Sequence, residues 1–131
     1  MERTAVNPVP WSVPMGFNQG ELVTGQTRTL YISGQTAMSA EGRPEHEDDL
    51  GAQLALSIDN LEAVLRAADM TLANLVRLTV YTTDVDLLFQ HYGVLAARLG
   101  QAGVAPTTTM LGVTRLAIPG QLVELEGTAV S

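Results

Sequence analysis

The chain has 131 residues, and 46% of them are hydrophobic, which predicts one globular domain spanning residues 1–131. It has no cysteine and no lysine, which excludes disulfides, thiolate nucleophiles and Schiff-base catalysis. The net charge is -7, and all seven cationic side chains are scattered arginines, so we expect a small-molecule partner and neither a nucleic-acid nor an anionic membrane surface.

The N-terminal part of the sequence predicts a loop followed by short strands. It lacks the apolar core of a signal peptide, and no apolar run reaches the roughly 20 residues of a membrane span, so we expect a cytoplasmic protein. Three prolines between positions 8 and 14 exclude a long helix or a central strand within residues 1–19. Residues 21–24 and 29–33 then read as the two strands of a hairpin.

Two amphipathic helices, with a strand between them, are predicted for the middle of the chain. From Asp49 to Ala68 the apolar residues recur at spacings of three and four, and Asp48 or Asp49 is in place to cap the helix start. Residues 75–82 alternate between apolar and polar side chains, which is typical of a strand. The second helix is expected over about residues 86–99.

The C-terminal part predicts a second hairpin that carries two acidic side chains. Residues 107–113 are rich in β-branched side chains, residues 122–130 alternate, and a Pro-Gly turn lies between them. The alternation puts Glu124 and Glu126 on the face opposite the apolar residues of their strand. A glutamate on a strand most often faces water, so the rest of the chain must decide whether these two face a ligand.

The predicted elements follow the order ββαβαββ, and the simplest α+β architecture for them is a single sheet covered on one face by two helices. The other face would carry the two glutamates among small and apolar residues, and such a mixed face is often one half of an interface. We therefore expect a closed homo-oligomer with small-molecule sites in the clefts between its subunits.

Short motifs spread over almost the whole chain resemble the Rid family, the reactive-intermediate deaminases that are also called YjgF-type proteins. Each motif is weak by itself, but together and in this order they are a strong signal. The motifs are Asn7-Pro8, Gly16-Phe17-Asn18-Gln19-Gly20, Ser33-Gly34-Gln35, Asn60-Leu61, Tyr81-Thr82-Thr83-Asp84, Pro106 with Thr109, Arg115-Leu116 and Val123-Glu124-Leu125-Glu126.

The resemblance implies a chorismate-mutase-like fold and a homotrimer with clefts between its subunits. It also implies that enamines and imines shed by pyridoxal-phosphate enzymes are hydrolysed to 2-oxo acids and ammonia without a cofactor; nothing in the sequence indicates a metal. Such a site needs a cation for the substrate carboxylate and an acid or base that positions water. Older labels of the family include endoribonuclease, but the acidic balance and the absence of lysine and of paired histidines make this the poorest reading.

The resemblance also assigns a candidate site. Glu124 matches the family glutamate that positions water, and it is the candidate catalytic residue. The candidate substrate-binding residues are Phe17, Gln19, Gly20, Ser33, Tyr92, Thr108 and Met110. Among these, Ser33 matches a site serine, Phe17 stands where many members carry tyrosine, and Tyr92 falls about where the family often has asparagine. Glu126 is interpreted as a structural residue that is paired within the oligomer.

One position departs from the family pattern. Active deaminases carry Pro-Ala-Arg-Ser, in which the arginine clamps the substrate carboxylate, and Thr108 stands in the place of that arginine here. The loss of a charge-assisted pair worth about 1.5–3 kcal/mol would weaken substrate binding by roughly one to two decades. The cleft would be less cationic and more aromatic, so a neutral or apolar ligand would fit it better than a small amino-acid imine.

Two functions remain as hypotheses, and the sequence does not decide whether the protein is an enzyme. The first is a cofactor-independent hydrolase of the imine or enamine deaminase type, with Glu124 orienting water and with weak or no activity on 2-aminoacrylate. The alternative is a non-catalytic trimer on the same scaffold that binds a small metabolite or a partner protein. The missing arginine motivates the alternative.

Overall fold

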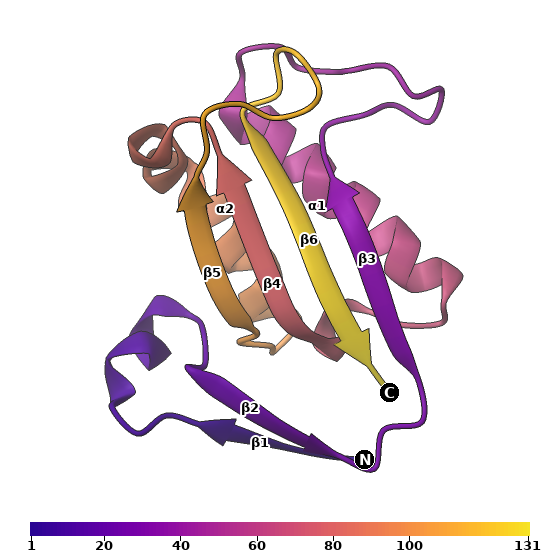
Figure 1. Cartoon of the computed structure of the whole chain (residues 1–131), viewed down its shortest axis with the longest axis vertical. Coiled ribbons are helices and arrows are strands. Elements are labelled where there is room, and N and C mark those ends of the chain that lie inside the picture. Colours follow the sequence, from indigo (N-terminus) through magenta and orange to yellow (C-terminus); the bar gives the residue numbers. More distant parts are fainter.

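The computed structural model describes residues 1–131 and contains a four-stranded sheet with both α-helices on one face (Figure 1). The strands lie in the order β3 (Thr29–Gln35), β6 (Val123–Val130), β4 (Leu75–Thr82) and β5 (Thr107–Gly112). Strands β4 and β5 are parallel, and β6 is antiparallel to both β3 and β4. The predicted α+β architecture, with two helices on one face of the sheet, is confirmed.

The two helices, α1 (Leu50–Ala67) and α2 (Val85–Gln101), are each preceded by an aspartate that caps the first turn. The carboxylates of Asp49 and Asp84 accept hydrogen bonds from first-turn N–H groups at 3.1 and 3.0 Å. Such caps satisfy N–H groups that have no partner inside the helix. The apolar sides of both helices and the covered face of the sheet form one core of 17 buried residues. Neither α1 nor α2 combines the length and the apolar character that a membrane-spanning helix needs.

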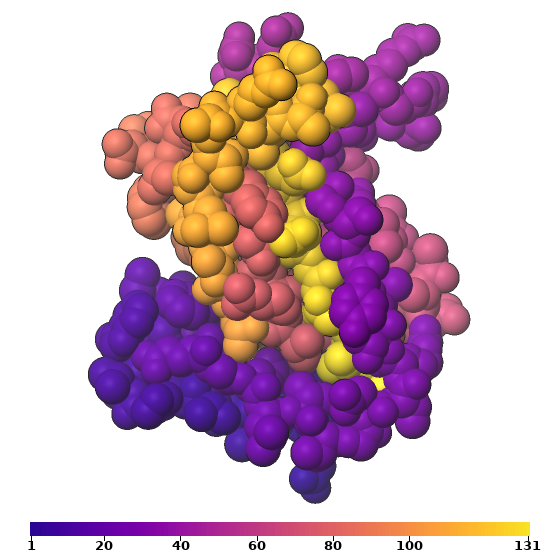
Figure 2. Space-filling model, viewed as in Figure 1, coloured from indigo at the N-terminus to yellow at the C-terminus, as the bar shows by residue number.

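Strand β6 alternates between the two faces of the sheet, as its sequence predicts. Val123, Leu125 and Ala129 are fully buried in the core, whereas Glu124 and Glu126 point to the opposite face. Figure 2 looks onto that opposite face and shows atoms of β4 and β6 between the flanking strands, so no segment of the chain covers them. This side of the sheet is termed the open face below.

The first predicted hairpin is wrong in its pairing. Strand β2 (Gly20–Thr24) pairs with an N-terminal strand, β1 (Glu2–Val6), and β3 pairs with β6 instead. Strand β1 forms because the prolines restrict only the residues from position 8 onward. Arg3 pairs with Glu21 and donates to the carbonyl oxygen of Leu75 at 2.8 Å, which holds the β1–β2 hairpin across the end of the sheet (Figure 1).

The second predicted hairpin is also wrong, although both of its strands exist. Strand β5 pairs with β4, and β6 lies between β4 and β3. The reason is the crossover through α2, because a helix between two strands returns the chain parallel to the first strand. The link over residues 113–122 then carries the chain across the end of β4 to the position of β6 (Figure 1).

Between β1 and β2 the chain forms a short 3-10 helix, η1 (Pro10–Met15), and a second one, η2 (Leu72–Asn74), precedes β4. The backbone N–H of Asn18 donates to the carbonyl oxygen of Ala105 at 3.1 Å, which ties the segment after η1 to the start of β5. The side chain of Asn7 accepts from the Gln19 N–H at 2.8 Å and closes the loop around η1. The N-terminal segment is therefore fixed beside β5 and α2.

Candidate functional site

The carboxylate of Glu124 lies against the backbone of β3. The pairing of β3 with β6 is irregular between Ile32 and Gln35, and this irregularity brings Gly34 next to the Glu124 side chain. A Cβ atom added at Gly34 would overlap Glu124 Oε1 and would lie 2.7 Å from Glu124 Cδ. The exposed side chain of Ser33 precedes this glycine. Gly34 of the sequence motif and Glu124 therefore meet on the open face, with Ser33 as the preceding residue of β3.

The surroundings of Glu124 increase the affinity of its carboxylate for a proton. Burial raises the pKa of the Glu124 carboxyl, and the negative charge of Glu126 raises it further. No hydrogen bond contributes to the shift, so nothing in the chain stabilises the ionised form. A half-buried carboxylate without a partner holds a proton more strongly than an exposed one, which suits a group that takes a proton from water.

Glu126 has a partner, in contrast to Glu124. The hydroxyl of Tyr81 donates to Glu126 Oε1 at 2.5 Å, and this hydrogen bond, with burial as a smaller cause, raises the pKa of Tyr81. The hydrogen bond fixes the Glu126 side chain across β4 and β6. The two acids of β6 therefore differ: Glu126 is held by the sheet, and Glu124 is free to act on something outside it.

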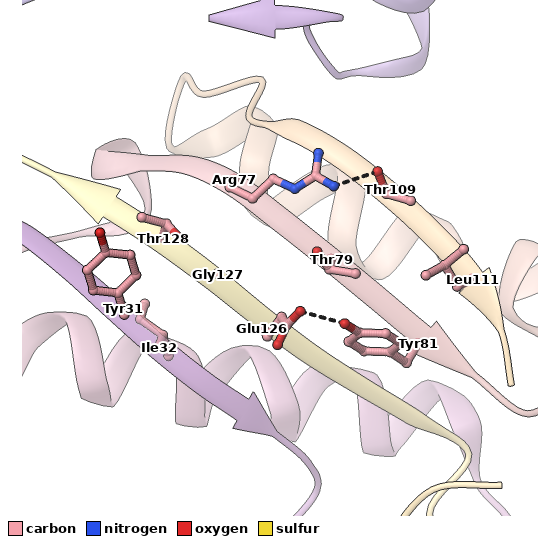
Figure 3. Close-up of a pocket in the computed structure, with 10 residues that line it drawn as sticks. All are labelled: Tyr31, Ile32, Arg77, Thr79, Tyr81, Thr109, Leu111, Glu126, Gly127 and Thr128. Carbon is pink, nitrogen blue, oxygen red and sulfur yellow. Dashed lines mark hydrogen bonds between the residues drawn. The ribbon is translucent and has the colours of Figure 1, made fainter. Parts of the chain in front are cut away.

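Glu126 and Tyr81 belong to a hollow of about 470 Å³ on the open face, the open-face pocket (Figure 3). Arg77 lies at its other end and donates to Thr109 Oγ1 at 2.9 Å, with Thr79 between the two hydrogen-bonded pairs. Sequence reasoning assigned no role to Arg77. The alternation of β4 could have placed Arg77 on the same face as Glu124 and Glu126, but the distance between Arg77 and these two residues depends on the register of β4 with β6. The pocket is lined by Tyr31, Ile32, Arg77, Thr79, Tyr81, Thr109, Leu111, Glu126, Gly127 and Thr128.

A second pocket of about 470 Å³, the helix-side pocket, lies between α2, β5 and the segment around η1. It is lined by Pro14, Met15, Phe17, Phe89, Tyr92, Ala96, Thr108 and Met110. Four predicted binding residues, Phe17, Tyr92, Thr108 and Met110, therefore lie together. Phe89 was missed by the sequence analysis, although it is three residues before Tyr92 and thus on the same side of the helix.

The helix-side pocket offers few polar groups. Thr108 Oγ1 donates to the carbonyl oxygen of Pro106 at 2.8 Å, so its hydroxyl hydrogen is already used within the chain. Burial raises the pKa of Tyr92, and no hydrogen bond contributes to that shift. No acidic or basic side chain lines the pocket. The hydroxyl of Tyr92 is its one free side-chain donor.

Gln19 and Gly20 lie outside both pockets. The Gln19 side chain donates to the carbonyl oxygen of Val9, and Gly20 pairs with Val6 at the end of the β1–β2 hairpin. Both residues shape the N-terminal segment that carries Phe17.

The two groups of candidate residues lie on opposite faces of the sheet. Thr108 pairs with Leu78 of β4, which also pairs with Gly127 of β6. Glu124 pairs with Tyr81, which is three residues after Leu78 on β4 and therefore points to the opposite face of the sheet. Residues that pair directly share a face, so Thr108 faces the helix layer and Glu124 the open face. A single protomer therefore contains two separate candidate half-sites: Glu124 with Gly34 and the neighbouring Ser33, and the helix-side pocket.

The histidines do not contribute to either half-site. His91 is half-buried on α2, where a Cβ atom added at Gly51 of α1 would lie 2.8 Å from its Nδ1 atom. His46 lies in the exposed loop before α1. No three histidine or carboxylate side chains converge closely enough to hold a metal ion.

The sheet order and the two helices on one face define a chorismate-mutase-like α+β protein. The chain belongs to the family described as Endoribonuclease L-PSP, the Rid family, whose model matches residues 15–131. The RutC family protein YjgH of Escherichia coli K12 is 31% identical over 117 residues, which cover 89% of this chain and 88% of that protein.

Solved structures agree with this membership. YyfB of Yersinia pestis, described as a Rid protein of unknown function, has a TM-score of 0.81 and 35% identity, with 100% of both chains covered. TdcF of Escherichia coli, solved with bound serine, has a TM-score of 0.71 and 25% identity, with 88% of this chain and 87% of that chain covered. The family model begins at residue 15, so β1 and most of η1 precede the matched part.

Proposed function

We propose that this protein is a cofactor-independent hydrolase that acts on a small imine or enamine in a cleft between two subunits of a homotrimer. The observation that carries the proposal is Glu124: a half-buried carboxylate on the open face, without a hydrogen bond and with a raised pKa. Clefts with titratable groups of this kind are where proton transfer to and from water takes place.

The placement of the half-sites supports a cleft between subunits. Glu124 and Thr108 lie on opposite faces of one sheet, so a single protomer does not bring them together. In a closed ring, the Glu124 side of one subunit approaches the helix-side pocket of its neighbour. The relative TdcF was solved with serine, which supports a small metabolite as the ligand in this family.

The chemistry needs only water and one base. Glu124 takes a proton from the water as its oxygen attacks the carbon of the C=N bond, the π electrons move to nitrogen, and Glu124 returns the proton to that nitrogen. Glu124 then takes the hydroxyl proton of the resulting carbinolamine and passes it to the nitrogen; the C–N bond breaks, the oxygen becomes a carbonyl group, and the nitrogen leaves as ammonia. An enamine enters the same path after one of its carbons gains a proton and its nitrogen loses one, which gives the imine.

Thr108 determines how well a substrate carboxylate is bound. The side chain is uncharged, and its hydroxyl donates to Pro106, so it offers no substitute for the charge-assisted clamp of the archetypal deaminases. Such a clamp contributes about 1.5–3 kcal/mol, or roughly one to two decades of affinity. We therefore propose that activity on 2-aminoacrylate is weak or absent and that the substrate lacks a carboxylate.

The proposal is tested by ammonia release from freshly generated imines with and without a carboxylate, measured against pH. Glu124→Gln should lower the rate by about 10²–10⁴-fold, because the base is removed. The wild-type rate should fall at acidic pH as the carboxylate becomes protonated, and the midpoint should lie above that of an ordinary glutamate because its pKa is raised. Glu126→Gln is the matched control: it keeps the base, and it moves the midpoint to lower pH because one negative charge is lost. Equal rates for the wild type and Glu124→Gln would remove Glu124 from the mechanism.

A non-catalytic trimer that binds a metabolite is the second candidate, and the occupied hydroxyl of Thr108 favours it. Native mass spectrometry after incubation with metabolite mixtures distinguishes the two functions. A molecule that is retained unchanged supports binding, and its hydrolysis product supports catalysis. The ribonuclease in the family description receives no support from this chain, because its net charge is -7 and its arginines are scattered.

A further inference from the structure

The proposed function leaves open which molecule occupies the helix-side pocket. We propose that this pocket holds an uncharged small molecule with a ring or a branched apolar group and a single hydrogen-bond acceptor, to which the hydroxyl of Tyr92 donates. This inference rests on the proposed function, because it names the class of molecule that is held beside the reacting bond.

The shape and lining of the pocket favour an apolar group. Its volume of about 470 Å³ is within the range of small-molecule sites, and six of the eight lining residues are hydrophobic. Two aromatic rings and a thioether line this pocket, from Phe17, Phe89 and Met110, and such groups contact planar rings favourably. A ring placed here removes apolar surface of both partners from water.

The pocket disfavours a charged molecule. No arginine or acidic side chain lines it, and Arg77 lies on the other face of the sheet in the open-face pocket. A carboxylate that entered would lose its hydration and gain no cation from this lining, which is costly. The molecule is therefore uncharged at the end that occupies this pocket.

Tyr92 provides the single point of polar recognition. Burial alone raises the pKa of Tyr92, and no hydrogen bond contributes to the shift. The hydroxyl therefore stays protonated at neutral pH and is able to donate. The other hydroxyl in the lining, that of Thr108, already donates to Pro106 at 2.8 Å. A single free donor in an apolar pocket selects a molecule with one acceptor placed at that donor.

The test is an NMR titration of the full chain labelled with [methyl-¹³C]methionine. The probes are acetophenone, which has a ring and one carbonyl acceptor, ethylbenzene, which lacks the acceptor, and benzoate, which carries a carboxylate. Met15 and Met110 line the pocket and report on it, whereas Met70 is buried in the core and serves as the internal control. Acetophenone should shift the methyl signals of Met15 and Met110 saturably, ethylbenzene should bind about three- to tenfold more weakly, and benzoate should leave these signals in place.

Tyr92→Phe should weaken acetophenone binding about three- to tenfold and leave ethylbenzene binding unchanged, because only the hydroxyl is removed. Tyr81→Phe is the matched control: it deletes a tyrosine hydroxyl in the open-face pocket and should change neither probe. The inference is overturned if benzoate binds as well as acetophenone, if no probe shifts Met15 and Met110, or if Tyr92→Phe weakens both neutral probes equally.

The titration also separates this inference from the proposed function, because binding does not require turnover. Selective acetophenone binding without ammonia release from any imine would leave the pocket assignment intact and remove the hydrolase. Turnover of a neutral imine without any effect at Met110 would keep the hydrolase and overturn the pocket assignment.

Discussion

Glu124 and Glu126 are two residues apart on one face of the same strand, yet their surroundings give them different properties. Tyr81 donates to Glu126 and fixes it, whereas Glu124 has burial and a neighbouring negative charge but no hydrogen bond. The difference comes from Gly34, because the absence of a Cβ atom there lets the Glu124 carboxylate lie against the β3 backbone. At the residue scale, a glycine therefore sets the position of the proposed base.

Gly34→Ala should move this carboxylate without unfolding the protein. The new Cβ atom would overlap Glu124 Oε1, which is the free end of a flexible side chain and is able to rotate toward solvent. The pKa of Glu124 should then fall toward the ordinary value for glutamate, because burial is the first cause of its raised pKa. Carboxyl ¹³C NMR against pH measures this shift, and the free energy of unfolding should change by less than about 1 kcal/mol.

Gly93→Ala on α2 is the control for this substitution, because an added Cβ atom has no neighbour within 4 Å there. It should leave the titration of Glu124 unchanged. An unaltered Glu124 pKa in Gly34→Ala would show that the glycine does not hold the carboxylate in its buried position.

At the scale of elements, the loops at one end of the sheet depend on a buried glutamine of α1. The side chain of Gln53 is fully buried and donates to the carbonyl oxygens of His46 and Gly120, both at 2.9 Å. It also accepts from the backbone N–H of Leu122 at 2.7 Å. Gln53 thereby joins the loop before α1 to the link before β6, and it fixes the start of the strand that carries Glu124.

Gln53→Leu should therefore cost about 2–4 kcal/mol of unfolding free energy. The substitution leaves two carbonyl oxygens and one N–H without their side-chain partner, and each unsatisfied buried group costs about 1–3 kcal/mol, reduced where water reaches it. Urea unfolding measures the loss. Gln90→Leu, at an exposed position of α2, is the matched control and should change stability by less than about 0.5 kcal/mol. Equal losses in the two variants would contradict the role of Gln53 as the connection between the loops.

The elements themselves could be predicted from the sequence, but their pairing could not. Periodicity and caps are local, so the predicted helix over residues 49–68 and the predicted strand over residues 75–82 match α1 and β4 closely. Which strands become neighbours depends on contacts distant in the sequence, and both predicted hairpins were wrong for this reason. The short strand β1 was missed because the prolines from position 8 onward were taken to make all of residues 1–19 a loop.

The same distinction applies to the candidate site. The alternation of β6 predicted the side on which Glu124 lies, because a period of two is a property of the strand alone. The separation of Glu124 from Thr108 follows from the register of β4 with β5 and β6, which no local pattern encodes. The grouping of Phe17, Tyr92, Thr108 and Met110 came from the family resemblance, and the structure brings these four residues together.

For the whole molecule, the proposed function builds each complete site from two copies of the chain, because Glu124 and Thr108 lie on opposite faces of one protomer's sheet. In a closed ring every subunit contributes its open face to one cleft and its helix-side pocket to another. A substitution that adds function to one half-site should then act together with the Glu124 of the neighbouring subunit. This expectation gives a test that does not depend on the natural substrate.

Thr108→Arg should raise ammonia release from 2-aminoacrylate by roughly one to two decades, because it restores a charge-assisted clamp for the carboxylate. The double variant with Thr108→Arg and Glu124→Gln should be inactive, since every cleft lacks the base. Mixed trimers of this double variant with the wild type, prepared by coexpression and identified by native mass spectrometry, should regain activity. One of the three clefts in each mixed trimer should pair the arginine of one subunit with the Glu124 of another. If the site were complete within one protomer, no subunit in the mixture would hold both groups, and the mixed trimers would be no more active than the wild type.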